Sequence, residues 1–129
     1  MIGEKNRSKT KKEANQLPVL TLAYIGDAVY ELVVRSKLLC QHKRVDELHK
    51  NTVEKVRAES QAEFLDRIKP YLEKDEDSIV RRTRNTKLNG CPKNVDISTY
   101  RKATALEALI GYLYLTGERD RITSLINRE

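Results

Sequence analysis

The chain has 129 residues, which is enough for one domain and no more. Hydrophobic residues make up 39% and charged residues 34%, with a mean hydropathy of −0.65, which excludes collagen-like, mucin-like and wholly disordered chains. Five Gly and three Pro are too few for a sandwich or barrel of many short strands, so the composition predicts helices. The net charge is +6.

Cysteine usage and the N-terminal sequence predict a cytoplasmic protein. Cys40 and Cys91 are too few for a disulfide scaffold, which is typical of a reducing compartment. The N-terminus is charged over residues 4–13 and contains no apolar core of a secretory signal. Asp27 and Glu31 interrupt the longest apolar run, so we expect no membrane span.

The order of apolar positions and helix-end residues predicts one domain of about six helices over residues 16–129. Residues 1–15 are basic and lack an apolar period, and we expect them to form a mobile N-terminal arm. Pro18 begins the first predicted helix, which continues to about Cys40 and is followed by a polar connector over residues 41–44.

The rest of the chain is predicted to be helical, apart from short connections and one irregular basic segment. Asp46 can cap the next helical stretch, and apolar positions continue at helical spacing from Thr52 until Pro70. No strand pattern competes, so the predicted fold class is all-α. The remaining predicted elements are a short helix over 73–84, a basic loop over 85–94, a long helix from Asp96 or Ser98 to about Thr116 that Gly117 ends, and a last short helix over 120–128.

Positive charge is concentrated in one segment. Residues 81–102 hold seven of the 25 Lys and Arg residues and one acid, so this segment alone carries a charge equal to the net +6 of the chain. Such a field is typical of a surface that binds phosphate groups, and a solvated basic loop without a ligand is the alternative. The bases are Arg81, Arg82, Arg84, Lys87, Lys93, Arg101 and Lys102.

Two of the predicted helices are apolar on almost every side, which indicates burial, and yet each carries carboxylates. In the first, Asp27, Glu31 and Arg35 share one stripe at four-residue spacing. In the second, Glu107 lies on the same face as Thr104. An isolated buried carboxylate is costly, so two helices that meet and share a cation would explain both acids. Ion pairs with bases are the alternative, and pairing with Arg35 is favoured for Glu31.

Glycines accompany both acids. Gly26 precedes Asp27, and Gly111 lies one turn after Glu107. A glycine inside a helix costs roughly 0.5–1 kcal/mol relative to alanine, so it needs a compensating reason. Close approach of the two helices, or of a ligand to the backbone, would provide one. The pattern therefore favours a functional site where these helices meet.

Two motifs carry a resemblance to a known family. LAYIGDAVYEL (residues 22–32) resembles the signature helix of the ribonuclease III family, and LEALIGYLYL (residues 106–115) resembles its second catalytic helix. The stretch PKNVDISTYRKATALEALIGYLYL is similar specifically to the Mini-ribonuclease III branch, which lacks a double-stranded RNA-binding domain. The resemblance covers roughly residues 17–125.

This resemblance implies an all-α ribonuclease III endonuclease domain, a helical bundle that cleaves double-stranded RNA with Mg²⁺ as a homodimer. Precursor 23S ribosomal RNA is then the expected substrate. The resemblance places the catalytic and metal-binding carboxylates at Asp27 and Glu107, and a dimer-interface aromatic residue at Tyr24. The basic segment is suited to binding RNA phosphates, and its expected RNA-binding residues are Arg81, Arg82, Arg84, Lys87 and Lys93.

The chain departs from ordinary members of the family at three positions. Leu20 and Ala23 stand where those proteins carry acids before Asp27, and Thr104 stands where they carry one before Glu107. The number of metal ions therefore stays open. Two alternatives also stay open: a non-catalytic double-stranded RNA-binding or ribosome-associated module on the same fold, and a helical dimerisation domain without a nucleic-acid role.

Overall fold

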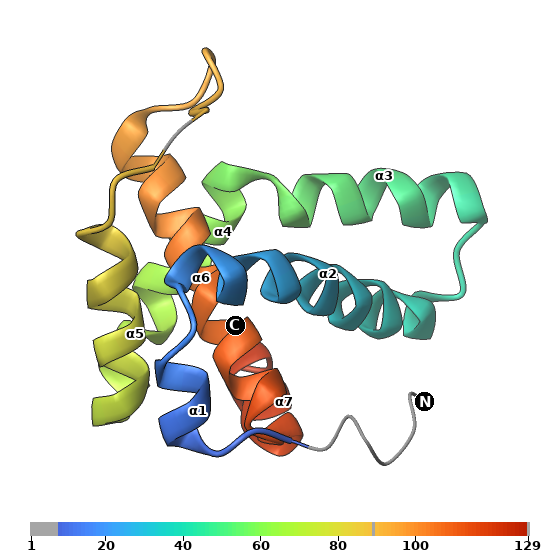
Figure 1. The fold of residues 1–129 in the computed structure, drawn as a ribbon. Coiled ribbons are helices and arrows are strands. Elements are labelled where there is room, and N and C mark those ends of the chain that lie inside the picture. Colours follow the sequence, from blue (N-terminus) through green and yellow to red (C-terminus); the bar gives the residue numbers. More distant parts are fainter. Residues whose placement is uncertain (1–7, 89, 129) are drawn as a thin grey trace.

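A computed structural model describes residues 8–88 and 90–128. Across these residues the chain forms seven α-helices and no β-strand (Figure 1), which confirms the predicted all-α fold class. Helix α3 has Arg44 as its N-cap, so Asp46, which was expected to be the cap, lies in the first turn instead. None of the described helices is both long and apolar enough to span a membrane. The helices are α1 (Lys11–Asn15), α2 (Val19–Leu38), α3 (Val45–Val56), α4 (Ala58–Ile68), α5 (Lys74–Arg84), α6 (Ile97–Leu115) and α7 (Arg119–Ile126), with 3₁₀ turns at Leu39–Gln41 and Lys69–Tyr71.

Helix α6 is the central element of the bundle. Helices α1, α2, α4, α5 and α7 all contact it (Figure 1). Every residue over 103–113 is buried except Glu107, which is partly buried. The carboxylate of Asp96 accepts hydrogen bonds from two N–H groups of the first turn, and Gly117 follows the helix with a φ of 78°. The predicted burial and both predicted ends of this helix are therefore confirmed.

Helix α2 is buried on one side only. That side contacts α6, whereas three large apolar side chains on the other side are exposed, Leu20 by 43%, Tyr24 by 79% and Leu32 by 64%. The prediction that this helix is buried all round is wrong for a single chain. The reason is that an apolar pattern indicates a covered surface but does not say which chain covers it. Exposed apolar surfaces of this kind are typical of interaction sites.

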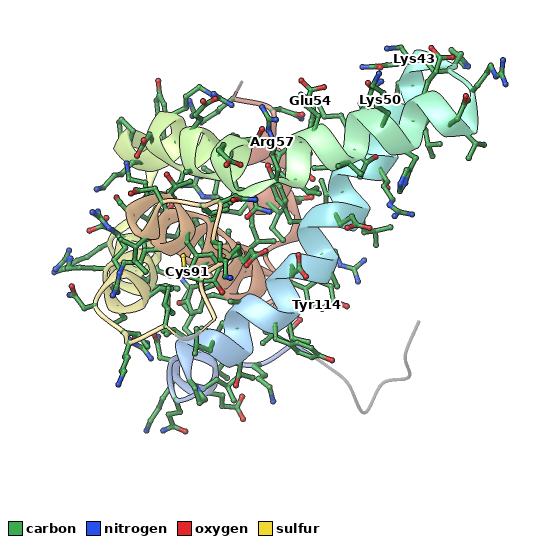
Figure 2. The ribbon with its side chains drawn as sticks, turned by 90° about the horizontal axis from the view of Figure 1, so that it is seen from above. Lys43, Lys50, Glu54, Arg57, Cys91 and Tyr114 are labelled. Carbon is green, nitrogen blue, oxygen red and sulfur yellow. The ribbon has the colours of Figure 1, made fainter. Side chains whose placement is uncertain are left out.

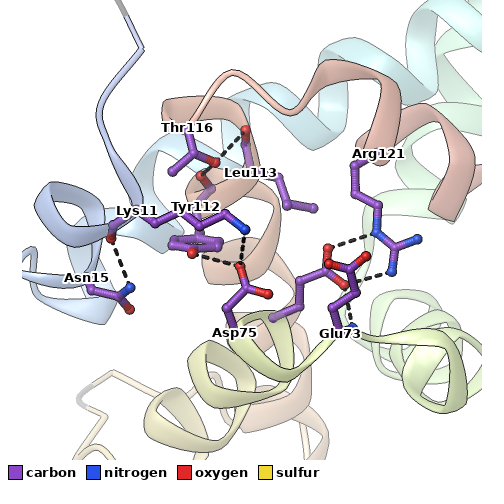
Figure 3. A network of polar contacts seen from close by, with 9 residues as sticks. Lys11, Asn15, Glu73, Asp75, Tyr112, Leu113, Thr116 and Arg121 are labelled. Carbon is purple, nitrogen blue, oxygen red and sulfur yellow. Dashed lines mark hydrogen bonds and ion pairs between the residues drawn. The ribbon is translucent and has the colours of Figure 1, made fainter.

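The N-terminal residues differ in part from the expected mobile arm over residues 1–15. Residues 1–7 lie outside the described residues, but the chain from residue 8 onwards is attached to the bundle. Helix α1 begins with a capping box. The Lys11 ammonium group lies 3.2 Å from a carboxylate oxygen of Asp75, and the Tyr112 hydroxyl donates to the same oxygen at 2.9 Å (Figure 3). These contacts fasten α1 to α5 and α6.

The helical stretch expected from Thr52 to Pro70 is broken at Arg57, where α3 meets α4 (Figure 2). Arg57 has φ −68° and ψ 157°, so its backbone is extended. The break leaves the last carbonyl oxygens of α3 without helical partners. One of them, on Val56, accepts a hydrogen bond from Nε2 of Gln61 at 2.7 Å. Helix α1 raises the number of described helices above the six or so that the sequence predicts.

Helices α2 and α6 approach each other closely enough for their backbones to touch. A Cβ atom added to Gly26 would collide with the backbone carbonyl oxygen of Glu107, and one added to Gly111 would collide with that of Leu22. Neither obstacle can move aside, because both belong to the backbone of a packed helix. The two glycines are thus required by close packing, as the sequence indicated.

We expect Gly26→Ala to destabilise the protein by about 3 kcal/mol, at the upper end of the cost of overpacking, because α2 must move away from α6. Gly90→Ala is the control. No atom lies within 4 Å of the Cβ that it would add, so only its φ of 76° opposes the change, at about 1 kcal/mol. Urea unfolding of both variants measures the difference. Equal losses in the two variants would contradict the backbone contact.

Candidate active site

Asp27 and Glu107 lie beside each other where α2 crosses α6. Their side chains are in hydrogen-bonding contact. The arrangement follows from the glycine contact, because Gly26 directly precedes Asp27 and touches the backbone of Glu107 itself. Asp27 is exposed and Glu107 is partly buried, so the pair is accessible from the side of Asp27. The structure thus brings together two acids that lie on separate apolar helices.

The surroundings of Glu107 favour its protonated form. Burial raises the pKa of its carboxyl from 4.5 to about 8, and the negative charge of Asp27 and the hydrogen bond between the two acids act in the same direction. A hydrogen bond from Gln61 opposes the shift. At neutral pH, Glu107 therefore keeps its proton and shares it with Asp27. A divalent cation held by both carboxyl groups would displace that proton.

The donor set at the crossing fits a cation that keeps most of its water. Among the described residues no cluster of three or more His, Cys, Asp or Glu side chains could hold a metal ion. Thr104, at the position where the family resemblance implies an acid in ordinary members, donates its hydroxyl to the carbonyl oxygen of Tyr100 at 3.0 Å. Mg²⁺ needs only one or two carboxylates, because water and substrate phosphate complete its octahedral shell. Asp27 and Glu107 can supply those two.

Gln61 is a member of this site that the sequence analysis missed. It lies on α4, is only 3% exposed, and its side-chain amide forms hydrogen bonds with the Glu107 carboxyl and with the Val56 carbonyl oxygen. A signal was present in the sequence, because Gln61 shares the apolar stripe of α4 with Leu65 and Ile68. A polar residue within an apolar stripe is the same signal that identified the two acids.

Glu31 does not belong to the carboxylate pair. Its side chain forms an ion pair with Arg35 at 2.7 Å, one helical turn away, which confirms the pairing that the sequence favoured. Both side chains are largely exposed, so this ion pair contributes little to stability.

The bases of the segment over 81–102 differ in what they contact. Arg82 is partly buried and donates to the carbonyl oxygen of Leu17 at 3.4 Å, so it fastens the start of α2 to α5. Arg101 donates at 2.9 Å to the carbonyl oxygens of Arg84, the last residue of α5, and of Thr86, just after the helix. These two guanidinium groups hold the protein backbone, which a count of charges in the sequence could not show.

The other expected RNA-binding residues, Arg81, Arg84, Lys87 and Lys93, are exposed. Arg81 lines two surface pockets. It shares one of about 360 Å³ with Arg84 and another of about 570 Å³ with Leu20. The basic surface at the end of α5 therefore continues onto the exposed side of α2, the helix that carries Asp27.

The raised pKa of Glu107 predicts how the metal-free protein responds to pH. A folded-state pKa above the unfolded value stabilises the fold fully below pH 4.5, and this stabilisation is lost as the pH rises through about 8. In EDTA, wild-type stability should therefore fall relative to that of Glu107→Gln as the pH rises from 5 to 8. Urea unfolding across this range measures the difference, and parallel curves for the two proteins would contradict the shift.

Comparison with known proteins places this site in a family. Residues 20–118 match the Ribonuclease III domain. The Mini-ribonuclease 3 of Thermoanaerobacter sp. (strain X514) is 48% identical over 91% of this chain and 83% of that protein, and the Mini-ribonuclease 3 of Brevibacillus brevis is 39% identical over 95% and 92%. A crystal structure of a Fusobacterium nucleatum protein matches with a TM-score of 0.80 and 32% identity over 87% of this chain and 92% of that one. The chain belongs to the ribonuclease III domain family.

Proposed function

We propose that this protein is a Mg²⁺-dependent endoribonuclease that cleaves double-stranded RNA. The observation that carries the proposal is the pair of carboxyl groups of Asp27 and Glu107, held together by backbone contact and open to solvent on one side. Relatives named Mini-ribonuclease 3 support RNA as the substrate. The resemblance to that branch makes precursor 23S ribosomal RNA in the cytoplasm the substrate that we expect.

Asp27 and Glu107 would hold Mg²⁺ through carboxylate oxygens. Bound Mg²⁺ supplies positive charge that polarises the scissile phosphodiester and favours in-line attack by water. To hold the ion, Glu107 would have to be ionised, so that its negative charge adds to that of Asp27. The water oxygen would form a bond to phosphorus while the bond between phosphorus and the 3′-oxygen breaks, and a proton from that water would pass to the 3′-oxygen. The products would be a 3′-hydroxyl and a 5′-phosphate.

The basic surface beside the site would bind the RNA backbone. Double-stranded RNA is recognised mainly through its shape, its phosphates and its 2′-hydroxyls, so exposed cations are more useful here than groups that read bases. Arg84, Lys87 and Lys93 are exposed in the required way, and Arg81 is exposed while its guanidinium group also pairs with Asp77 at 2.6 Å. Arg82 would act mainly by holding the start of α2 in place, because its guanidinium group is already engaged there.

A second copy of the chain would cover the exposed side of α2. Leu20, Tyr24 and Leu32 expose large apolar surfaces on this helix, and Tyr24 is the interface residue that the family resemblance implies. A symmetric dimer uses the same surface on both partners. It would present two carboxylate pairs, one for each strand of an RNA duplex.

A non-catalytic double-stranded RNA-binding or ribosome-associated module is the second candidate. The observation in its favour is that Leu20, Ala23 and Thr104 occupy positions where ordinary family members carry acids. The two candidates differ in whether the purified protein hydrolyses RNA. They do not differ in whether it binds RNA.

Asp27→Asn should abolish cleavage of a plain RNA duplex, with a loss of roughly a thousandfold or more, and leave RNA binding nearly unchanged. The change is almost isosteric but removes one of the charges that hold the ion. Metal-free stability should stay level or rise, because a carboxylate no longer faces Glu107. Single-turnover cleavage with Mg²⁺ and with EDTA, together with a filter-binding assay, tests each part.

Glu107→Gln should have a similar effect, and the double variant should be little worse than either single variant, because the two acids would serve one ion. Turnover near the wild-type rate in Asp27→Asn would remove this residue from the mechanism. Wild-type protein that binds the duplex without cutting it at any Mg²⁺ concentration would favour the non-catalytic module.

Neutralising Arg81 and Arg84 to Gln should weaken binding to duplex RNA without changing the cleavage rate at saturating enzyme. Each lost phosphate contact should flatten the dependence of log K on log salt by about 0.7–0.9. The loss should be the same on two duplexes of unrelated sequence, because phosphates carry no base information. Arg82 is left unchanged in this variant because it also holds Leu17.

Lys43→Gln with Lys50→Gln is the matched control for that variant. It removes the same charge from the far part of the α2–α3 hairpin (Figure 2), away from the basic surface at the end of α5. Its salt dependence should equal that of the wild type. An unchanged salt slope in the Arg81 and Arg84 variant would show that this surface faces away from the RNA.

A further inference from the structure

One buried side-chain atom in the described part of the chain lacks a hydrogen-bond partner: Oε1 of Gln61. Buried amide oxygens are almost always paired, because leaving one unpaired is unfavourable. Gln61 is 3% exposed, so bulk water does not compensate for the missing partner. An apolar side chain of similar length would fill the same space without this penalty. The unpaired oxygen therefore indicates that a hydrogen-bond donor binds to it when the protein carries out its function.

The orientation of the Gln61 amide follows from its neighbours. Nε2 lies 2.7 Å from the Val56 carbonyl oxygen, so the nitrogen must face that carbonyl, because exchanging nitrogen and oxygen would place two acceptors against each other. The amide also donates to the Glu107 carboxyl. The nitrogen is thus engaged with Val56, and the amide acts on the Glu107 carboxyl, so its unpaired oxygen belongs to a group that borders the carboxyl pair.

The structural role of Gln61 accounts for its nitrogen alone. Donation to Val56 satisfies a carbonyl oxygen at the break between α3 and α4. That role needs a donor and gives no reason for an acceptor next to Glu107. The chemistry that needs an acceptor there is a water molecule held by a cation. Mg²⁺ retains several waters, and acceptors around a metal site orient them.

We propose that Gln61 is a positioning residue of the cation site, whose Nε2 fixes the Glu107 carboxylate and whose Oε1 accepts a hydrogen bond from a water of the hydrated cation. This inference rests on the proposed function, because it takes Asp27 and Glu107 as the ligands. It adds a neutral oxygen from a third helix, α4, to a site that otherwise consists of two carboxyl groups. Gln61 acts through Glu107 and through water, without touching the RNA.

The test compares Mg²⁺ binding to RNA-free protein in the wild type, Gln61→Met and Asp27→Asn. Methionine matches glutamine in length and carries neither the N–H groups nor the oxygen. Apparent affinity is read from the rise in melting temperature with Mg²⁺ concentration, each protein being referred to its own value in EDTA. Gln61→Met should bind Mg²⁺ about 10- to 100-fold more weakly. Gln16→Met, which makes the same change at an exposed position, should bind like the wild type.

The Gln61 side-chain amide signals in an NMR titration of the wild type provide a second measurement that needs no Gln61 variant. These signals should shift with Mg²⁺ in parallel with the melting temperature, and they should not shift in Asp27→Asn. Fixed signals during a titration that stabilises the wild type would overturn the inference.

The outcomes separate the inference from the proposed function. If Mg²⁺ stabilises the wild type but not Asp27→Asn, and Gln61→Met retains wild-type affinity, the role of Gln61 is wrong and the carboxylate site stands. If Mg²⁺ stabilises the wild type and Asp27→Asn equally, the carboxylate site itself is wrong, and the inference about Gln61 fails with it.

Discussion

The contact between the backbones of α2 and α6 is the constraint on which the rest of this structure depends. Gly26 lies against the carbonyl oxygen of Glu107, so no side chain separates the two helices at that point. The carboxyl groups that extend from the flanking positions are therefore neighbours, and burial of one of them raises its affinity for a proton. A slightly wider crossing would leave two ordinary acids on two helices. The same packing holds the two helices together and holds the two carboxyl groups beside each other.

Polar groups around this crossing serve both the fold and the site. The amide of Gln61 contacts the end of α3 and the carboxyl of Glu107. One side chain therefore stabilises the break between α3 and α4 and also orients a carboxyl group of the site. Arg82 similarly holds the start of the helix that carries Asp27. In a chain of 129 residues, some of the side chains that stabilise the fold are also the ones that surround the site. A substitution at either position would therefore affect stability and activity together.

Much of the architecture was predictable because α6 follows local rules without conflict. Its apolar surround, its Asp96 cap and the glycine after its end all agree with the structure. The break at Arg57 was not predictable from periodicity, because the apolar positions of α3 and α4 continue at helical spacing across it. The two acids were identifiable since each lies within an apolar helix. Gln61 was missed because a neutral amide is a weaker signal than a charge.

Because five other helices enclose α6, we expect local unfolding of the bundle to reach α6 last. Amide protons in the middle of such a helix exchange with solvent only when the surrounding structure opens. We expect the segment that holds Glu107 to exchange last, whereas Asp27 lies on a helix with one open side. We therefore expect fluctuations that separate the two acids to begin with α2. Any partner that covers the open side of α2 suppresses those fluctuations, so assembly and the integrity of the carboxyl pair are thermodynamically linked.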